Sequence, residues 1–369
     1  MIKLDPANID MGGIKEAAEL IDAGALVAFP TETVYGIACR ARSDSLGRLD
    51  RVKGRSAQKR FTLHIAQPSN VDTYVPTMKI IARKLIRNAW PGPVTIVFEL
   101  QRRDIDIQRK KLEPDVFESL YKNGSIGIRC PDHPVATALL GQTLNPVVAP
   151  SANLTGHSPA VNGEQVLRRL SGRIDMLLDA GPSQYGVNST VVKMSKKGLE
   201  ILRPGVCSKE RLRTLSKVKF LFVCTGNTCR SPMAEGFCKK YLAEKLHAHI
   251  DELDQIGYTV DSAGVIGSVG FPASPQAVVA CAAKGVDLGA HRNKGLSEKL
   301  IEESDFIYVM EPAHREKVLA IVPSAAGRCL LLEENGRVLD PIGHPQSFYD
   351  SCAEQIQKAV TERIDELAI

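Results

Sequence analysis

A cysteine and an arginine stand close together in a short polar loop, where they could transfer a phosphoryl group. The stretch FLFVCTGNTCRSPMAEGF, residues 220–237, leads from an apolar run into Cys224 and ends the loop at Arg230. Ser231 suits a helix N-cap and Pro232 the first helical position, so we expect a helix to begin there. Loop amides and a helix N-terminus form a concave anion site, and an arginine can grip two phosphate oxygens. A thiol in this field is expected to have a lowered pKa and to act as a nucleophile.

A structural zinc site is an alternative use of these cysteines. It would combine Cys224 and Cys229 with Cys238 and His247. The spacing is irregular, and the loop lacks the paired C-x2-C arrangement typical of zinc ligands. A bare C-x5-R pattern also arises by chance in a chain with nine cysteines. The expected strand before the loop and the capped helix after it favour the anion site.

A phosphoryl transfer to a cysteine also needs an acid that protonates the leaving group. Asp340, in the stretch VLDPIGHP, is the candidate for this role. A plain turn is the simpler interpretation of any single Asp-Pro pair. Asp340 is therefore a candidate acid only in combination with Cys224 and Arg230.

The C-terminal part of the chain, residues 218–369, resembles the low-molecular-weight protein tyrosine phosphatase family along its whole length. CTGNTCRS corresponds to the phosphate loop of that family, and DP at 340–341 to its acid loop. DSAG at 261–264 and LGAHR at 288–292 correspond to structural landmarks. The resemblance implies a doubly wound, four-stranded parallel sheet with flanking helices and a phosphatase that needs no cofactor.

The same resemblance implies a role for each residue of the site. Cys224 would form a phosphocysteine intermediate, Arg230 would bind the phosphate, and Asp340 would protonate the leaving group and then activate water. Cys229 would be a backup thiol that traps Cys224 as a reversible disulfide. The phosphate loop and the side chains that shape it would be Thr225, Gly226, Asn227, Thr228, Cys229, Ser231, Ser262 and His291.

Thr228 bears on the class of substrate. Tyrosine-specific members of the family carry an aliphatic residue before the second cysteine, whereas CTGNTCRSPMAE resembles the protein-arginine phosphatase branch. A hydroxyl can hydrogen-bond a guanidinium or the attacking water, which an isoleucine cannot do. Phosphoarginine is therefore favoured over phosphotyrosine, although a threonine can also simply fill space beside the loop. Arsenate reduction is a further alternative, but it needs a relay of extra thiols, of which only Cys229 is well placed.

Two stretches of the N-terminal half combine hydroxyl, amide and basic side chains. AFPTETVYGIACRA, residues 28–41, and VAPSANLTGHSPA, residues 148–160, each lead from a strand into a polar turn. Lys53 and Arg55 come shortly before another strand. Converging groups of these types suit the phosphates of a nucleotide and a small zwitterion. Taken singly, the two cations also fit a solvated helix end, and the Ser-Ala-Asn turn an ordinary cap.

Together these stretches resemble the threonylcarbamoyl-AMP synthase family, the YrdC/Sua5 domain, over residues 1–205. The matches follow in order along the chain: PTETVYGI, K-x-R at 53–55, LHIA, WPGPVT, GIRCPDHP, APSANLTG, STVV and LRPG. The resemblance implies a twisted, mixed α/β sheet with a concave basic surface. It also implies an enzyme that joins L-threonine, bicarbonate and ATP into threonylcarbamoyl-AMP and pyrophosphate, with Mg²⁺ on the triphosphate. The product would feed t6A formation at position 37 of tRNA.

The residues carried over from this family form two sets. The threonine pocket would comprise Thr33, His64, Arg129, Ala149 and Ser189. The ATP site would comprise Lys53, Arg55, Lys59, Ser125, Ser151, Asn153, Ser158 and Arg203. No metal ligand is expected from the protein itself.

This half also departs from the family pattern, and a second function stays open for it. RSAQKRF replaces a proline-containing stretch after K-x-R, Asn188 stands where an acidic residue is usual, and residues 101–124 are more charged than is typical. The alternative is an RNA-binding module without catalysis, because this fold can present a basic concave face. The favoured interpretation is a bifunctional enzyme whose partners are a tRNA-modifying transferase complex and phosphorylated proteins, with weak or no direct binding of tRNA.

The elements that must position these residues alternate between strand and helix. In the first half we expect strands at 25–30, 61–66, 94–100, 125–129, 146–150, 175–179 and 189–194, with helices at 78–90 and 135–142. In the second half we expect strands at 218–223, 257–262, 305–310 and 329–332, with helices from Ser231, at 275–285 and at the C-terminus. This alternation predicts two α/β domains. The domains would be residues 1–205 and 218–369, joined by a charged linker at 206–217 that follows a Pro-Gly pair.

Composition excludes several classes of protein. The chain has 369 residues, 44% hydrophobic and 24% charged, with no long apolar segment and no signal-peptide layout at its beginning. Nine scattered cysteines do not form a secreted disulfide framework, so we expect a reduced, cytoplasmic protein. A net charge of +5, 5% aromatic residues and a single tryptophan, Trp90, do not by themselves indicate a nucleic-acid binder.

Overall fold

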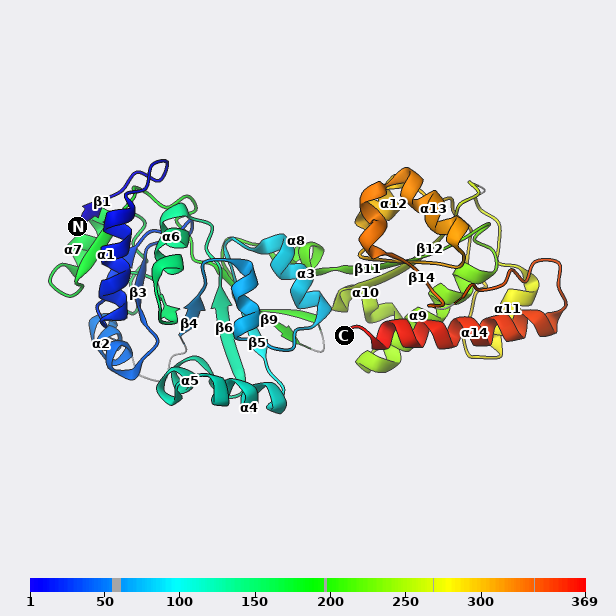
Figure 1. The fold of residues 1–369 in the computed structure, drawn as a ribbon, viewed down its shortest axis with the longest axis horizontal. Coiled ribbons are helices and arrows are strands. Elements are labelled where there is room, and N and C mark those ends of the chain that lie inside the picture. Colours follow the sequence, from blue (N-terminus) through cyan, green and yellow to red (C-terminus); the bar gives the residue numbers. More distant parts are fainter. Residues whose placement is uncertain (55–60, 196–197, 268, 335) are drawn as a thin grey trace. The chain divides into compact units, whose positions relative to one another are not determined.

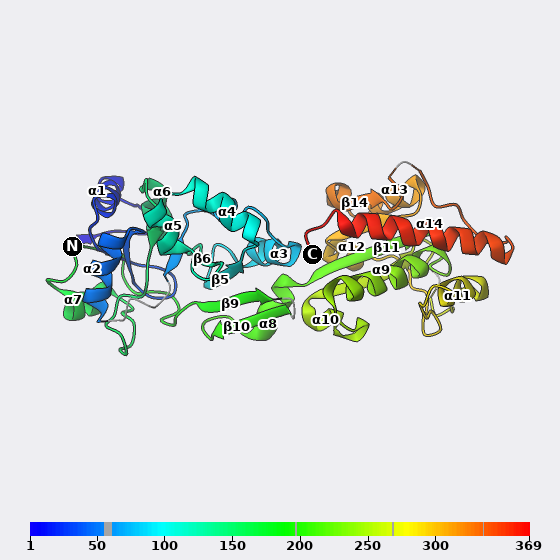
Figure 2. The same cartoon turned by 90° about the horizontal axis from the view of Figure 1, so that it is seen from below.

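The computed structural model describes residues 1–54, 61–195, 198–267, 269–334 and 336–369. The described chain forms two compact units (Figures 1 and 2). Unit 1 comprises Met1–Met78 and Ala82–Leu215, and unit 2 comprises Lys79–Ile81 and Ser216–Ile369. The segment expected as a linker contains helix α8, Lys209–Ser216.

Unit 1 is built on a ten-stranded mixed sheet, which confirms the expected fold class. The strand order is β1-β8-β2-β3-β7-β4-β6-β5-β9-β10. Figure 2 shows β9 and β10 side by side, as their antiparallel pairing requires. The strands are β1 (Ile2–Lys3), β2 (Val27–Phe29), β3 (Gly36–Arg40), β4 (Thr62–His64), β5 (Val94–Glu99), β6 (Ser125–Arg129), β7 (Val147–Val148), β8 (Met176–Asp179), β9 (Thr190–Ser195) and β10 (Gly198–Arg203).

Helices cover this sheet and bury its apolar side chains. Helix α1 packs against α6, and both contribute small and aliphatic side chains to one core with β2, β3, β7 and β8. Asp10 caps α1 by accepting hydrogen bonds from the Gly12 and Gly13 amides, which starts the helix where sequence reasoning placed no element. The remaining helices are α2 (Ser43–Lys53), α3 (Ile80–Ala89), α4 (Arg102–Lys111), α5 (Pro114–Leu120), α7 (Gly163–Leu170) and the 3-10 turn Pro68–Thr73, with α1 at Met11–Asp22 and α6 at Pro134–Gln142.

Unit 2 is a doubly wound, four-stranded parallel sheet, as the sequence predicts. Its strand order is β12-β11-β13-β14, and Figure 1 shows α12 and α13 on one side of the strands with α9 and α14 on the other. The strands are β11 (Val218–Cys224), β12 (Tyr258–Gly264), β13 (Phe306–Val309) and β14 (Cys329–Leu331). The helices are α9 (Arg230–Leu246), α10 (Leu253–Ile256), α11 (Pro275–Ala282), α12 (Glu298–Glu303), α13 (Pro312–Ile321) and α14 (Gln346–Asp365), with 3-10 turns at Ile250–Glu252 and Pro323–Arg328.

The closing helix α14 shows how its sequence pattern directs packing. Apolar residues recur every four positions along it, and Cys352, Ile356, Val360 and Ile364 are buried. Phe348 differs, because it is only half-buried and its ring stacks on His344 at a centroid distance of 4.4 Å. The stripe therefore faces the interior of unit 2, where α14 packs against α9 and α11.

Candidate functional sites

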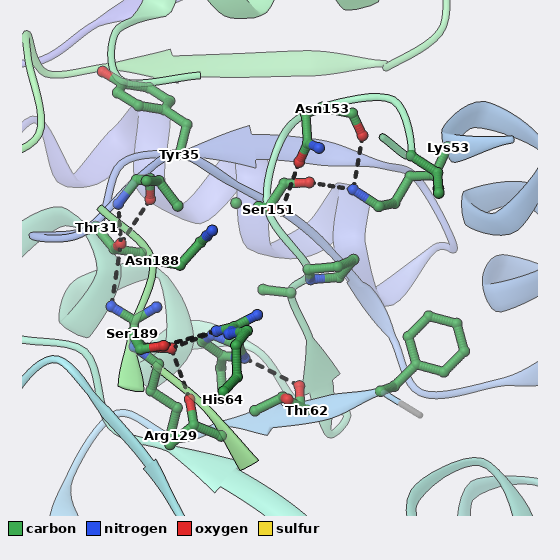
Figure 3. A pocket seen from close by; sticks show the side chains of 18 of the residues that line it. Thr31, Tyr35, Lys53, Thr62, His64, Arg129, Ser151, Asn153, Asn188 and Ser189 are labelled. Carbon is green, nitrogen blue, oxygen red and sulfur yellow. Dashed lines mark hydrogen bonds between the residues drawn. The ribbon is translucent and has the colours of Figure 1, made fainter. Parts of the chain in front are cut away.

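Unit 1 contains a polar cavity of about 370 Å³ between the strand ends and the polar turns (Figure 3). The described residues that line it include two arginines and a lysine but no acidic residue. The lining residues are Thr31, Val34, Tyr35, Gly36, Lys53, Phe61, Thr62, His64, Thr95, Arg129, Ala149, Pro150, Ser151, Asn153, Thr155, Gly156, Asn188, Ser189 and Arg203. A cavity with this lining is suited to an anionic ligand.

Lys53 ties the Ser-Ala-Asn turn to the end of helix α2. Its ammonium donates to the carbonyl oxygens of Ser151 and of Asn153, the latter at 2.8 Å (Figure 3). The Ser151 hydroxyl donates to Asn153 Oδ1 at 2.6 Å, and the Asn153 amide donates to the carbonyls of Leu154 and His157. The turn is thus held by a buried cation and by its own side chains.

Arg129, at the carboxyl end of β6, is held by the turn that follows β2. Its Nη2 donates to Glu32 Oε1 at 2.9 Å, to Thr33 Oγ1 at 2.6 Å and to Thr31 Oγ1 at 3.3 Å. All these side chains are buried. Arg129 Nε and Glu32 Oε2 have no hydrogen-bond partner among the described residues. These contacts therefore fix the orientation of the guanidinium, and its Nε–H remains available to donate to a ligand.

His64, at the end of β4, is neutral and offers an acceptor. Its Nδ1 lies 3.1 Å from the Thr62 carbonyl oxygen, which can only accept, so Nδ1 carries the proton and Nε2 carries the lone pair. Burial, and then the charge of Arg129, lower the pKa of His64 to about 3. An uncharged acceptor in an electropositive cavity suits a hydroxyl or ammonium donor of a ligand.

A third basic group comes from the end of β10. Arg203 Nη2 donates to the carbonyl of Ser189 at 2.9 Å and to its hydroxyl at 3.1 Å. The Ser189 hydroxyl also lies 2.9 Å from Thr95 Oγ1. Burial, and then the nearby charge of Arg129, lower the pKa of Arg203. Two guanidiniums thus face one cavity, which favours binding of an anion between them.

The structure brings most of the residues expected in these two sets to one place. Ala149 and Ser151 line the cavity together with the basic residues and His64, and Thr33 lies behind Arg129. Ser125 is at the opposite end of β6, where its hydroxyl donates to Lys122 O, and Ser158 is exposed, so neither is among the described residues of the lining. Arg55 and Lys59 fall outside the described residues. Four lining threonines were not predicted: Thr31, Thr62, Thr95 and Thr155.

In unit 2 the phosphate loop joins β11 to α9, and its neighbours hold it in shape. Asn227, at a positive φ of 55°, is fully buried and donates through Nδ2 to the hydroxyls of Ser231 at 2.9 Å and Ser262 at 2.8 Å. His291 Nε2 donates to the Asn227 carbonyl at 2.8 Å. Gly264, on β12, leaves room for the loop, because a Cβ there would lie 2.9 Å from Thr225 O. The predicted supporting residues thus gather around one loop.

Cys224 lies at the centre of this loop. The Asn227 amide donates to Cys224 Sγ at 3.2 Å, and the Ser231 hydroxyl lies 3.0 Å from the same sulfur. Because Ser231 Oγ accepts from Asn227, its own hydrogen is available to the sulfur. These donors and Arg230 favour the thiolate, yet burial outweighs them and raises the pKa of Cys224. The expectation of a lowered pKa is therefore wrong, because sequence reasoning did not account for the burial of the thiol.

Arg230 and Asp340 are paired directly. Arg230 is 1% exposed, and its two terminal nitrogens each meet a carboxylate: Nη1 donates to Glu311 Oε1 and Nη2 to Asp340 Oδ2. Nη1 also donates to Val338 O at 3.0 Å and Nη2 to Thr225 Oγ1 at 3.2 Å. The expected catalytic residues are therefore in one site, together with Glu311, which sequence reasoning missed.

The second cysteine of the loop sits among hydroxyl groups. Cys229 Sγ lies 3.2 Å from Ser274 Oγ, 3.6 Å from the Tyr349 hydroxyl and 3.7 Å from Thr228 Oγ1. Burial, and then the hydrogen bond with Cys229, raise the pKa of Tyr349 to about 12. All nine cysteines are buried. Thr228 is half-buried beside the loop.

Among the described residues, no three His, Cys, Asp or Glu side chains are grouped so that they could hold a metal ion. Within that same part of the chain, no helix is both long and apolar enough to cross a membrane.

Comparison with known proteins assigns a family to each half. Residues 19–205 match the Sua5/YciO/YrdC family, described as telomere recombination, and residues 219–368 match the low molecular weight phosphotyrosine protein phosphatase family. The threonylcarbamoyl-AMP synthase of Bacillus subtilis is 34% identical over 203 residues, which are 55% of this chain and 56% of the relative. A putative threonylcarbamoyl-AMP synthase of Mycobacterium tuberculosis is 35% identical over 201 residues, 54% of this chain and 87% of the relative.

Solved structures also align with parts of this chain. A Pyrococcus abyssi Sua5 variant aligns with 72% of this chain and 82% of its own at 23% identity and a TM-score of 0.51, which shows a shared fold. The YwlE arginine phosphatase aligns with 40% of this chain and 95% of its own at 30% identity and a TM-score of 0.36. The chain therefore belongs to the Sua5/YciO/YrdC family through its N-terminal half, and its C-terminal part is a domain of the low-molecular-weight phosphotyrosine protein phosphatase family.

Proposed function

We propose that unit 1 joins L-threonine, bicarbonate and ATP into threonylcarbamoyl-AMP, with release of pyrophosphate and water. The supporting observation is the convergence of Lys53, Arg129 and Arg203 with a neutral His64 in one cavity. The relatives of the N-terminal half carry this activity in their names. The amino group of threonine takes up the carbon of bicarbonate, and a carbamate oxygen then displaces pyrophosphate from the α-phosphorus of ATP.

The residues of the cavity act by positioning and by neutralising charge. Arg129, oriented in advance by Glu32, would hold the threonine carboxylate, and His64 Nε2 would accept from its hydroxyl or amino group. Lys53, Arg203 and the residues of the Ser151 turn would face the phosphates, with Arg55 and Lys59 added from outside the described residues. No acidic side chain is among the described residues of the lining, so Mg²⁺ would arrive with the nucleotide, held by phosphate oxygens.

Threonine-dependent release of pyrophosphate from ATP tests this function. We expect release by the purified chain only when L-threonine and bicarbonate are both present, together with the adenylate in equal amount. The alternative for this half is an RNA-binding module without catalysis. Absence of threonine-dependent pyrophosphate alongside retained binding of tRNA would refute the synthase and support that module.

We propose that unit 2 is a cysteine-dependent phosphatase for phosphorylated proteins. The supporting observation is the packing of Cys224, Arg230 and Asp340 around one anion-binding loop. The thiol proton passes to a phosphoryl oxygen, the sulfur attacks phosphorus, and Asp340 gives its proton to the leaving group. Water, deprotonated by Asp340, then cleaves the phosphocysteine and releases inorganic phosphate.

Phosphoarginine is the favoured substrate, because Thr228 presents a hydroxyl beside the loop. One neutral hydrogen bond contributes about 1 kcal/mol, so it changes the preference roughly fivefold. Assay of phosphoarginine and phosphotyrosine with the wild type and with Thr228→Ile tests the assignment. An unchanged preference after the substitution would refute it.

The two activities in one chain suggest its cellular partners. Threonylcarbamoyl-AMP is a reactive mixed anhydride, so a tRNA-modifying transferase would consume it for t6A at position 37. The phosphatase would act on phosphorylated proteins. Nine cysteines scattered along the chain, without the pattern of a secreted disulfide framework, support a reducing, cytoplasmic location.

A further inference from the structure

Two residues at the start of helix α13 connect to the guanidinium of Arg230, one directly and the other through Thr225. Glu311 is the N-cap residue of α13, just beyond the carboxyl end of β13, the strand next to β11. It contacts Arg230 Nη1 directly. His314, in the first turn, lies 2.9 Å through Nε2 from Thr225 Oγ1, which in turn accepts from Arg230 Nη2. No motif of the sequence analysis includes either residue.

The two edges of the guanidinium have different partners. Nη1 is bound by Glu311 and by the Val338 carbonyl, and neither of these belongs to the phosphate loop. Nη2 is bound by Thr225 of the loop and by Asp340, the candidate acid. Nη1 is thus the anchored edge, and Nη2 is the edge at which Asp340 and an incoming phosphoryl group compete.

The polarity of the Thr225 contact follows from hydrogen-bond chemistry. An arginine can only donate, so Thr225 Oγ1 accepts from Arg230 and directs its own hydrogen to His314 Nε2. His314 is then the neutral tautomer with its proton on Nδ1, an atom that is buried without a partner among the described residues. Burial, and then the charge of Arg230, lower the pKa of His314, which agrees with a neutral ring.

The charges around Arg230 decide how firmly Asp340 is held. One buried cation meets two carboxylates, of which Glu311 is 28% and Asp340 39% exposed. Burial raises the pKa of Glu311, but the hydrogen bond and charge of Arg230 outweigh it and lower the pKa overall, so Glu311 is ionised. With Glu311 removed, the whole positive charge of Arg230 would act on Asp340, the more exposed carboxylate. A carboxylate that accepts such a bond cannot donate a proton to a leaving group.

We propose that Glu311 is a positioning residue: by anchoring Arg230 and offsetting its charge, it allows Asp340 to exchange places with the phosphoryl group and to act as the acid. This inference rests on the proposed phosphatase activity. Glu311 contacts Arg230 Nη1, and its effect passes through that guanidinium. Loss of its charge should therefore impair proton donation by Asp340 and spare steps that need no proton.

Two aryl phosphates separate these effects in the full-length protein. The phenolate of phenyl phosphate needs a proton in order to leave, whereas the 2,4-dinitrophenolate of 2,4-dinitrophenyl phosphate leaves without one. For Glu311→Gln we expect kcat/KM for phenyl phosphate to fall about tenfold, a part of the 10²–10⁴ that proton transfer contributes. The value for 2,4-dinitrophenyl phosphate should fall less than twofold. Glu316→Gln, the same change at an exposed position of α13, is the matched control and should equal the wild type for both substrates.

The other outcomes are equally decisive. Equal losses with both substrates, or no loss with either, would overturn the role of Glu311. Glu311→Asp keeps the charge and should retain at least half of the wild-type value for phenyl phosphate, and a loss as large as that of Glu311→Gln would also overturn it. A wild-type chain that hydrolyses neither aryl phosphates nor phosphoarginine would instead refute the proposed phosphatase.

Discussion

Breaking the buried ion pair between Glu32 and Arg129, beside the cavity, should strongly lower the free energy of unfolding of unit 1. The two side chains are 2% and 7% exposed, and Glu32 Oε1 lies 2.9 Å from Arg129 Nη2. The substitution Glu32→Ala removes the carboxylate and leaves the guanidinium with only the hydroxyls of Thr31 and Thr33. A buried charge that loses its counterion is strongly destabilising, because the desolvation of the remaining ion is no longer offset.

The expected cost follows from that environment. Removing one partner of a buried ion pair lowers the free energy of unfolding by about 3–5 kcal/mol. Because Arg129 keeps two hydroxyl partners, we expect Glu32→Ala to lie at the low end of that range, at ~3 kcal/mol. For a unit of this size that corresponds to a fall in Tm of about 6–12 °C. The exposed pair of Arg168 and Glu164, at 71% and 78% exposure, provides the matched control. Glu164→Ala should cost less than about 0.5 kcal/mol.

The single tryptophan allows unit 1 to be followed by itself. Trp90 is 5% exposed and its indole donates to Val94 O at 2.7 Å, so its fluorescence reports unfolding of that unit. Urea titrations of the wild type, Glu32→Ala and Glu164→Ala would give the free energies of unfolding. Equal costs for the two substitutions would refute the reasoning that burial of Arg129 makes its counterion essential. L-threonine should also bind more weakly to Glu32→Ala.

Two further predictions concern single residues. The pKa of His64 is about 3 in the fold and ~6.5 when unfolded, so the unfolded chain binds the additional proton below pH ~6.5. The stability of unit 1 should therefore be fully present above that pH and fall by about 1.4 kcal/mol per pH unit below it, with a flatter dependence in His64→Gln, as measured by Trp90 fluorescence in urea; identical slopes would contradict the burial argument. Asn227→Ala removes the donors to Ser231 and Ser262 and should cost unit 2 about 2 kcal/mol, measured by thermal unfolding, while lowering phosphatase kcat/KM at least tenfold; a fully active variant would show that the loop keeps its shape without this side chain.

Sequence reasoning found most of the phosphate loop because its chemistry is continuous along the chain. Cys224 and Arg230 lie in one strand–loop–helix unit, where capping and loop residues have local signatures. Glu311 and His314 were missed because they reach the loop only through the pairing of β11 with β13. The raised pKa of the Cys224 thiol could not be predicted from the sequence either, because its burial depends on the assembled site.

In unit 1 the predicted strands form, but several elements and contacts depend on tertiary structure. Helix α1 has Gly12 and Gly13 in its first turn, which weaken its local signal, and β10 is an edge strand that pairs, among the described residues, with β9. Thr31 and Thr95 enter the cavity through the ends of distant strands. Ser125 lies at the far end of β6 from Arg129, so a residue matched by motif stands apart from the cavity.

We infer that this chain carries two complete sites, one in each unit. The most direct measurement is threonine-dependent pyrophosphate release by the Cys224→Ser protein, with phosphatase activity recorded on the same sample. We predict release at the wild-type rate and no phosphatase turnover. Loss of pyrophosphate release in this variant, or turnover of phosphate without the sulfur, would contradict the account.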